Sequence, residues 1–239
     1  MELAFDLRRT RNLAINANYT LSFAEGTGSD SRTASIIAWR SQTGVFPETL
    51  APLAFDRRHN LNVSLDYRLG QDEGPMIGGV YPLAGFGFNL LGVLQSGSPY
   101  TQLDQQALES PILQSTNGGA VGQVNSVYLG FTNRIDLKVD RAFNLGPADF
   151  RGYLWIQNLF DQDQIYGVYR DTGLADDDGF LATDPDAVRA LPTELEREAF
   201  RFLYSQYVNS PVVQDGFGVS GGQFYGLPRR IRLGVTLDF

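Results

Sequence analysis

The C-terminal segment, residues 228–239 (PRRIRLGVTLDF), is the feature that most constrains the fold. From Ile231 onwards every second residue is apolar, while Arg230, Arg232 and Asp238 lie in the opposite register. Because strand side chains alternate between two faces, this pattern predicts a strand with one apolar face and one charged face. A strand of a soluble sandwich shows the same alternation. The length and recurrence of the pattern therefore decide between a sandwich and a membrane barrel.

The alternation recurs in six further segments, and several of them reach ten residues or more. A tilted membrane strand needs about 9–11 residues, whereas strands of soluble domains are commonly about five or six. Aromatic residues such as Tyr67 and Phe143 lie towards the strand ends, as in the aromatic girdles of membrane barrels. The predicted strands are residues 2–9, 12–23, 58–69, 85–95, 134–143, 150–160 and 228–239. The sequence predicts an all-β fold, an antiparallel transmembrane β-barrel segment, with the β-sandwich as the alternative.

Short turns and long connections alternate between these strands, as they do in outer-membrane barrels. The apolar face is predicted to contact lipid, since an Arg near the bilayer midplane costs about 2–4 kcal/mol. Arg141 is an exception, because it falls in the apolar register of its strand. It lies near the predicted periplasmic end, where the cost falls to about 0–1 kcal/mol and a long side chain reaches the interface.

Composition excludes several classes of function. The chain has 19 basic and 27 acidic residues, a net charge of −8, which argues against a nucleic-acid partner. It has no cysteine and a single histidine, so thiolate chemistry and a histidine cluster for zinc are absent. We expect no cofactor and no enzyme activity, since His59 has no convincing partner for acid–base or nucleophilic catalysis.

Four runs carry a family resemblance. They are FDRRHNLNVSLDYRLG (55–70), LQSGSPYT (94–101), WIQNLFD (155–161) and YGLPRRIRLGVTLDF (225–239). In this order and spacing they resemble the closing segments of TonB-dependent outer-membrane receptors. The subgroup with an Oar-like or carboxypeptidase-regulatory-like N-terminal extension is the most similar. Residues 1–239 then correspond to one domain, the C-terminal part of the receptor barrel.

The resemblance implies a fold, a location and a set of partners. In this family a plug domain fills a barrel of about 22 strands. An N-terminal TonB box receives energy from the TonB complex, and the receptor takes up a nutrient across the outer membrane of a Gram-negative bacterium. The implied partners are outer-membrane lipid, the plug, the N-terminal barrel strands, the TonB complex and a ligand. Siderophores, cobalamin, oligosaccharides and peptides all remain open as ligands.

Seven strands with unpaired edges do not satisfy their backbone groups in lipid. We therefore expect further strands and a plug outside residues 1–239, and no stable monomeric pore from this chain alone. The alternative is an eighth strand at residues 164–170 or 217–225. Closure with eight strands would give a small self-contained barrel with a structural or adhesive role through its loops.

Seven side chains are the candidates for contact with a ligand or with the barrel lumen. Arg57 and His59 lie at a strand start near the predicted extracellular rim. The others lie in the polar register, where we expect them to pair with one another or with a plug. They are Asp66, Arg68, Arg134, Arg230 and Arg232.

The last long connection contains two further features. Asp176, Asp177 and Asp178 form an acidic stretch that suggests either a calcium site or a solvated loop. Residues 193–210 predict an amphipathic helix with a capping box between Thr193 and Glu196. This helix is interpreted either as a lid or as a packed cover over the barrel mouth. Its predicted buried stripe is Leu195, Phe202, Leu203 and Tyr207.

Overall fold

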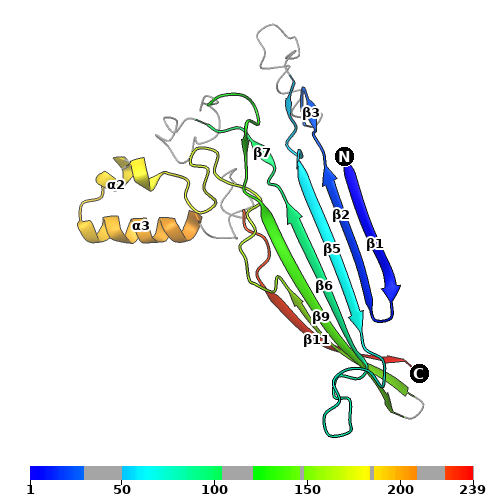
Figure 1. Cartoon of the computed structure of the whole chain (residues 1–239). Coiled ribbons are helices and arrows are strands. Elements are labelled where there is room, and N and C mark those ends of the chain that lie inside the picture. Colours follow the sequence, from blue (N-terminus) through cyan, green and yellow to red (C-terminus); the bar gives the residue numbers. More distant parts are fainter. Residues whose placement is uncertain (30–49, 104–120, 146–147, 184–185, 209–223, 239) are drawn as a thin grey trace.

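The computed structural model describes residues 1–29, 50–103, 121–145, 148–183, 186–208 and 224–238 (Figure 1). Its main element is a seven-stranded sheet in which all neighbouring strands are antiparallel. The strands, in sheet order, are β1 (Glu2–Thr10), β2 (Leu13–Leu21), β5 (His59–Arg68), β6 (Phe86–Gln95), β9 (Thr132–Leu145), β10 (Ala148–Gln157) and β11 (Arg230–Asp238). The predicted antiparallel all-β fold and its seven strands are confirmed.

The strand register places the apolar residues on one face, here called the apolar face. One row crosses all seven strands and consists of leucine and isoleucine alone. It runs Leu7, Ile15, Leu65, Leu90, Leu137, Ile156 and Ile231. The opposite face, here called the polar face, carries rows such as Ala14, Asp66, Asn89, Lys138, Trp155 and Arg232. The period of two therefore holds across the sheet as well as along each strand.

Strand β6 departs from this pattern. Leu91 pairs with Ser64 and Asp136, and Val93 pairs with Asn62 and Arg134, so both apolar side chains lie on the polar face. They account for the weak alternation of this segment in the sequence. Long-range pairing with β5 and β9 sets the register that the sequence of β6 leaves open.

The connections separate into two ends. The described residues 22–29, 50–58, 96–103, 121–131, 158–183, 186–208 and 224–229 lie at one end, which we call the long-connection end. The turn at Arg11–Asn12 lies at the other end, as do Leu145 and Ala148, where β9 ends and β10 begins (Figure 1). Residues 69–85 also lie at this second end and form a longer connection than a tight turn. Two short ribbons stand at the long-connection end. They are β3 (Glu25–Gly26) with β4 (Ala51–Pro52), and β7 (Pro99–Tyr100) with β8 (Val127–Tyr128).

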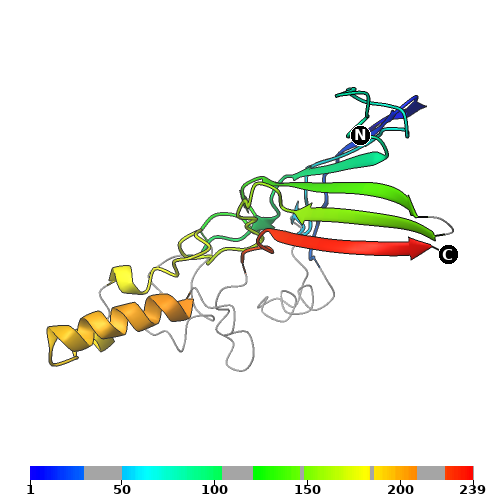
Figure 2. The same cartoon turned by 90° about the horizontal axis from the view of Figure 1, so that it is seen from below.

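The described sheet is a single open layer. Its outermost strands are β1 and β11, and Figure 2 shows one curved sheet without a second sheet stacked on it. Among residues 164–170 and 224–225, the isolated bridge between Ile165 and Tyr225 is the one strand-like pairing, so no eighth strand joins the sheet there. The rest of the second candidate, residues 217–223, lies outside the described residues. In the described parts of the chain, no helix has the length and apolarity needed to cross a membrane.

The last connection forms a small unit of its own. It contains a 3₁₀ turn (Leu181–Thr183), α2 (Asp186–Arg189) and α3 (Glu194–Val208). The fully buried apolar side chains of the described residues all belong to it, namely Ala175, Phe180 and Val188. Figures 1 and 2 show α3 extending beyond the ends of the strands.

Helix α3 confirms the predicted capping box. The Thr193 amide donates to Glu196 Oε2 at 3.0 Å, and the Glu196 amide donates to Thr193 Oγ1 at 3.3 Å. The predicted buried stripe is wrong, because Leu195, Phe202 and Leu203 are exposed at 76%, 64% and 65%. The Tyr207 side chain lies outside the described residues.

The inner side of α3 carries a different pair of aromatic residues. The Tyr204 ring lies 4.8 Å from that of Phe180, and Phe200 stacks on Tyr204 at 5.9 Å between ring centroids. Tyr204 also donates a hydrogen bond to the buried Asp178. This contact with a residue outside the helix selects the side of α3 that packs.

Candidate functional site

The candidate site consists of two groups of polar side chains. One is an ion-pair network on the polar face of the sheet, and the other is a cluster at the long-connection end. The first contains the predicted residues Asp66 and Arg68, and the predicted residues Arg57 and His59 flank Arg58 of the second.

The network on the polar face centres on Asp140, which is 5% exposed. Its Oδ2 atom lies 3.4 Å from Arg68 Nη1 and 3.7 Å from Arg151 Nε, and Arg68 Nε lies 3.1 Å from Asp66 Oδ1. Gly87 lies between Arg68 and Asp140 on β6, where a Cβ atom would come within 2.9 Å of Asp140 Oδ1. The glycine therefore allows charged side chains from β5, β9 and β10 to meet across the sheet.

A second ion pair joins the polar face to the last connection. Asp136 is 5% exposed, and its Oδ1 atom lies 3.2 Å from Arg134 Nε and accepts the Asn158 amide at 2.9 Å. Asn158 has a positive φ of 55°, and its side chain exchanges hydrogen bonds of 2.9 and 3.0 Å with the backbone of Gln162. Thus Arg134 pairs with Asp136, and Asp136 also positions Asn158, the first residue after β10.

Arg230 and Arg232 are placed differently from the other predicted residues. Both lie on the outermost strand β11, and Arg232 lies over the Trp155 ring with its Cζ atom 5.3 Å from the ring centroid. Arg230 pairs in register with Gln157. Among the described side chains neither guanidinium has a carboxylate within ion-pair distance. Lys138, which lies over the Tyr153 ring, is a third cation of the polar face without a carboxylate partner among the described side chains.

The cluster at the long-connection end surrounds Asp56, which is 1% exposed. Asp56 accepts hydrogen bonds from the Ala24 amide (2.9 Å), the Tyr128 hydroxyl (2.9 Å) and Arg58 Nε (3.3 Å), while Arg58 Nη2 donates to the Tyr128 oxygen at 2.6 Å. Burial raises the pKa of Asp56, but these hydrogen bonds and the charge of Arg58 outweigh it, so the pKa lies below its ordinary value. The hydrogen bond between Asp56 and Tyr128 therefore links the connection between β2 and β5 to the connection between β6 and β9.

Arg57 and His59 point to different surroundings. Arg57 Nη1 donates to Gln95 Oε1 at 2.7 Å, and its Cζ atom lies 6.0 Å from the centre of the Tyr166 ring. His59 Nδ1 lies 2.8 Å from the Tyr19 hydroxyl, and its ring lies 6.0 Å from that of Phe131. His59 is therefore part of an aromatic group at the end of the apolar face, whereas Arg57 contacts Gln95 of β6 and Tyr166 of the last connection.

The carboxylates of the acidic stretch accept hydrogen bonds from backbone amides two residues further along the same connection. Asp177 Oδ1 accepts the Gly179 amide at 2.8 Å, and the buried Asp178 accepts the Phe180 amide at 3.1 Å. Within the described residues, no three His, Cys, Asp or Glu side chains gather as a metal site would require, and this includes Asp176. The side chains of Asp177 and Asp178 therefore act in the fold of the connection.

Sequence reasoning missed Asp56, Tyr128 and Asp140 as members of the site. Asp140 has a visible signal, because it lies in the same polar register as Asp136. Asp56 and Tyr128 have no such signal, since they belong to connections and meet over 72 positions of sequence.

Comparisons with protein-family models, curated proteins and solved structures return no match for this chain. The geometry alone therefore defines what the site can do. It offers guanidinium, carboxylate and amide groups on one face of a sheet and aromatic and cationic groups at one end of it. Such an arrangement can bind a polar or anionic molecule.

Proposed function

We propose that this chain forms part of the barrel wall of a TonB-dependent receptor in the outer membrane of a Gram-negative bacterium. The observation that carries the proposal is the apolar face. Leu233 and Val235 are exposed at 80% and 70%, while Asp136 and Asp140 on the other face are buried at 5% exposure. This inside-out distribution suits a wall between lipid and a polar lumen.

The strand lengths support the same proposal. Strands β5 and β6 have 10 residues each. At about 3.4 Å per residue and a tilt of about 45°, such a strand spans about 24 Å, close to the apolar band of about 25 Å in outer-membrane barrels. Aromatic side chains lie near both ends of the apolar face, with Tyr19 and Phe131 at one end and Phe86 and Phe143 at the other.

In this proposal the receptor binds a nutrient at the long-connection end and passes it along the polar face. Strands from outside this chain would pair with β1 and β11, a plug would fill the lumen, and the TonB complex would supply energy. The reaction is differential binding without a chemical step. Arg57, Arg230 and Arg232 would contact the ligand or the plug, whereas the paired Arg68 and Arg134 would hold the wall together.

The assignment of the two faces is tested with single cysteine variants, which are unique labels because the chain has no cysteine. Leu65→Cys and Ser64→Cys are neighbours on opposite faces of β5. With the complete receptor that contains this chain reconstituted in phosphatidylcholine vesicles, a fluorophore at position 65 should be quenched by brominated phosphatidylcholine. A fluorophore at position 64 should be quenched by iodide in the water. Equal quenching of the two positions by iodide would contradict the proposal.

Transport requires a separate experiment on the source organism. Deleting the reading frame that encodes this chain and deleting TonB should abolish uptake of the same nutrient, which a panel of siderophores, cobalamin, oligosaccharides and peptides would identify. Unchanged uptake of the whole panel would argue against a receptor. Folding of this chain alone into a heat-modifiable monomer in detergent would favour the small self-contained barrel with an adhesive or structural role.

A further inference from the structure

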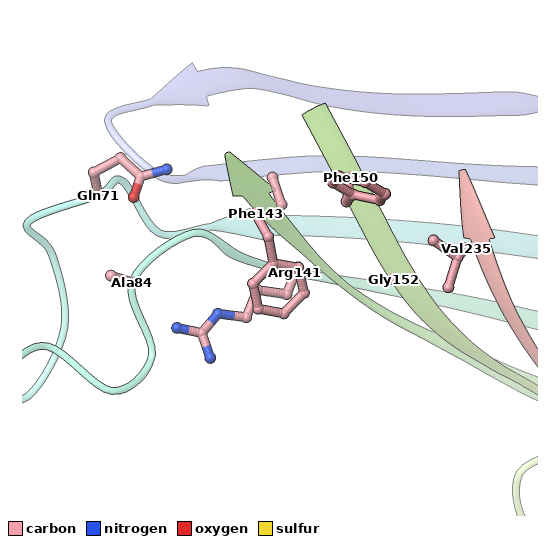
Figure 3. Close-up of a pocket in the computed structure, with 8 residues that line it drawn as sticks. Gln71, Ala84, Arg141, Phe143, Phe150, Gly152 and Val235 are labelled. Carbon is pink, nitrogen blue, oxygen red and sulfur yellow. The ribbon is translucent and has the colours of Figure 1, made fainter. Parts of the chain in front are cut away.

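A groove crosses the apolar face near the end that carries the short turns (Figure 3). Its volume is about 760 Å³, and an adjoining hollow of about 660 Å³ continues it across β9, β10 and β11. The floor is Gly152, which lies in the cross-strand row between Arg141 and Val235. A Cβ atom at Gly152 would have the Phe143 ring as its nearest neighbour at 3.8 Å, so the missing side chain creates the groove.

Arg141 is the charged side chain of this groove. Its Cζ atom lies 4.9 Å from the centre of the Phe86 ring and 5.0 Å from that of Phe143. Among the described side chains no carboxylate lies within ion-pair distance of it. In the described strands from β2 to β11, no other Lys, Arg, Asp or Glu occupies the apolar register. The face thus presents a single unpaired guanidinium held between two aromatic rings.

The surroundings of Arg141 define the chemistry of what it can bind. A guanidinium is suited to a phosphate, with which it forms two hydrogen bonds in parallel. Phe150, Val235 and Leu233 lie along the course of the groove, and Gln71 adds a neutral polar group at its margin. Arg141 also lies opposite Phe86, the first residue of β6, and hence near the edge of the apolar band, where lipid headgroups lie.

We propose that this groove binds one phospholipid with an anionic headgroup. The headgroup phosphate contacts Arg141, and an acyl chain lies over Gly152 towards Val235 and Leu233. Charge complementarity selects this occupant, because a neutral apolar partner would leave the guanidinium without a counter-charge in a low-dielectric setting. The inference rests on the membrane location proposed above.

The test uses the complete receptor that contains this chain, with a fluorophore on Ala84→Cys at the margin of the groove (Figure 3). The receptor is reconstituted in phosphatidylcholine vesicles that contain either brominated phosphatidylglycerol or brominated phosphatidylcholine. Quenching then gives the relative affinity of the site for the two lipids. We expect a preference of about fivefold for phosphatidylglycerol, the effect of one basic residue at an anionic surface.

Four variants identify the groups responsible. Arg141→Gln and Arg141→Leu should abolish the preference, and Arg141→Lys should retain most of it. Gly152→Leu fills the groove and should weaken quenching by both lipids. Lys138→Gln is the matched control, since it removes one positive charge from the polar face of the same strand. Its preference should remain that of the unsubstituted chain.

The outcomes separate the two proposals. Quenching at position 65 without a preference at position 84 would overturn the lipid site and leave the membrane location intact. A loss of preference in Lys138→Gln equal to that in Arg141→Gln would also overturn it, since net charge would then be the cause. Loss of the preference on addition of inorganic phosphate would show an anion site in place of a lipid site. Absence of lipid quenching at both positions would refute the lipid site together with the membrane location.

Discussion

The sheet and the last connection differ in which side chains they bury. In the last connection, Phe180 and Val188 are both 1% exposed, as in the core of a small soluble domain. In the sheet, Asp136 and Asp140 are the buried residues, while Leu233 is 80% exposed. One chain therefore contains a unit with a small buried apolar core and a larger unit without one.

The difference indicates what each unit needs. The last connection supplies Tyr204 as a partner for Phe180, so the burial of Phe180 needs no apolar partner from outside the unit. The sheet pairs its buried carboxylates Asp136 and Asp140 with arginines but leaves a continuous apolar surface, which requires lipid or another apolar partner. Four substitutions test this contrast, from the largest expected effect to the smallest.

Phe180→Ala should have the largest effect, confined to the last connection. Removal of a buried phenylalanine costs about 3–5 kcal/mol, because a cavity replaces its contacts with Tyr204. Hydrogen exchange of the α3 amides should accelerate, while exchange in β5 and β6 should remain unchanged. Phe202→Ala is the control, since Phe202 is 64% exposed and its loss should change the free energy of unfolding by less than about 0.5 kcal/mol. Faster exchange in the sheet would show that the two units are coupled.

Leu65→Arg should destabilise the sheet in vesicles. Leu65 lies in the aliphatic row, and an Arg near the midplane of a bilayer costs about 2–4 kcal/mol. Urea unfolding of the reconstituted chain, followed by tryptophan fluorescence, measures this free energy. Ser64→Arg on the polar face is the control. Equal losses in both variants would remove the distinction between the faces.

Acidification should release the Asp56 cluster. A carboxyl group with a lowered pKa in the fold stabilises it above the ordinary aspartate pKa of about 3.9, and this stabilisation is lost as the pH falls through the lower folded pKa. The NMR signals of the Tyr128 ring, whose hydroxyl donates to Asp56, should shift below that value.

Asp56→Asn should remove this pH dependence and cost about 1–3 kcal/mol at neutral pH, because buried donors lose a charged acceptor. Asp72→Asn, in the connection at the other end of the sheet, should leave the transition unchanged. A transition above pH 4 would be inconsistent with a lowered pKa.

Thr193→Ala should have the smallest effect. It removes the side-chain acceptor of the Glu196 amide at the start of α3, at a cost of about 1 kcal/mol. Exchange of the first-turn amides of α3 should accelerate by about fivefold, in keeping with that cost. In contrast, Ser205→Ala within α3 should be neutral or stabilising, because alanine favours the helix interior. A loss in Ser205→Ala as large as that in Thr193→Ala would argue against the cap.

The strands could be predicted because each carries its own signal. In β5, Leu61, Val63, Leu65 and Tyr67 alternate with polar residues. This local pattern predicts both a strand and which of its residues lie on the apolar face. Arg134 and Asp136 are two residues apart on one strand, and their pairing also follows from local spacing.

The features that sequence reasoning missed depend on distant residues. Helix α3 has two apolar sides, one with Leu195 and Phe202 and one with Phe200 and Tyr204, and the position of Phe180 decides which one packs. The hydrogen bond between Asp56 and Tyr128 likewise joins two connections whose paths no local pattern specifies. Closure of the sheet depends on what pairs with β1 and β11, which the local pattern of neither strand specifies.

The aliphatic row also bears on errors of assembly. Shifting β9 by one residue would replace Leu137 with Asp136 or Lys138. The shifted pairing would place a charge in the aliphatic row and would therefore be energetically unfavourable. Strand β6 has the weakest safeguard, because a shift in one direction replaces Leu90 with another leucine, Leu91, whereas a shift of β2 or β10 changes the type of residue in the row. The residue pattern therefore specifies the strand register least strongly at β6, the central strand of the sheet. We expect a misassembled form of this chain to differ from the native one first in the pairing of β6.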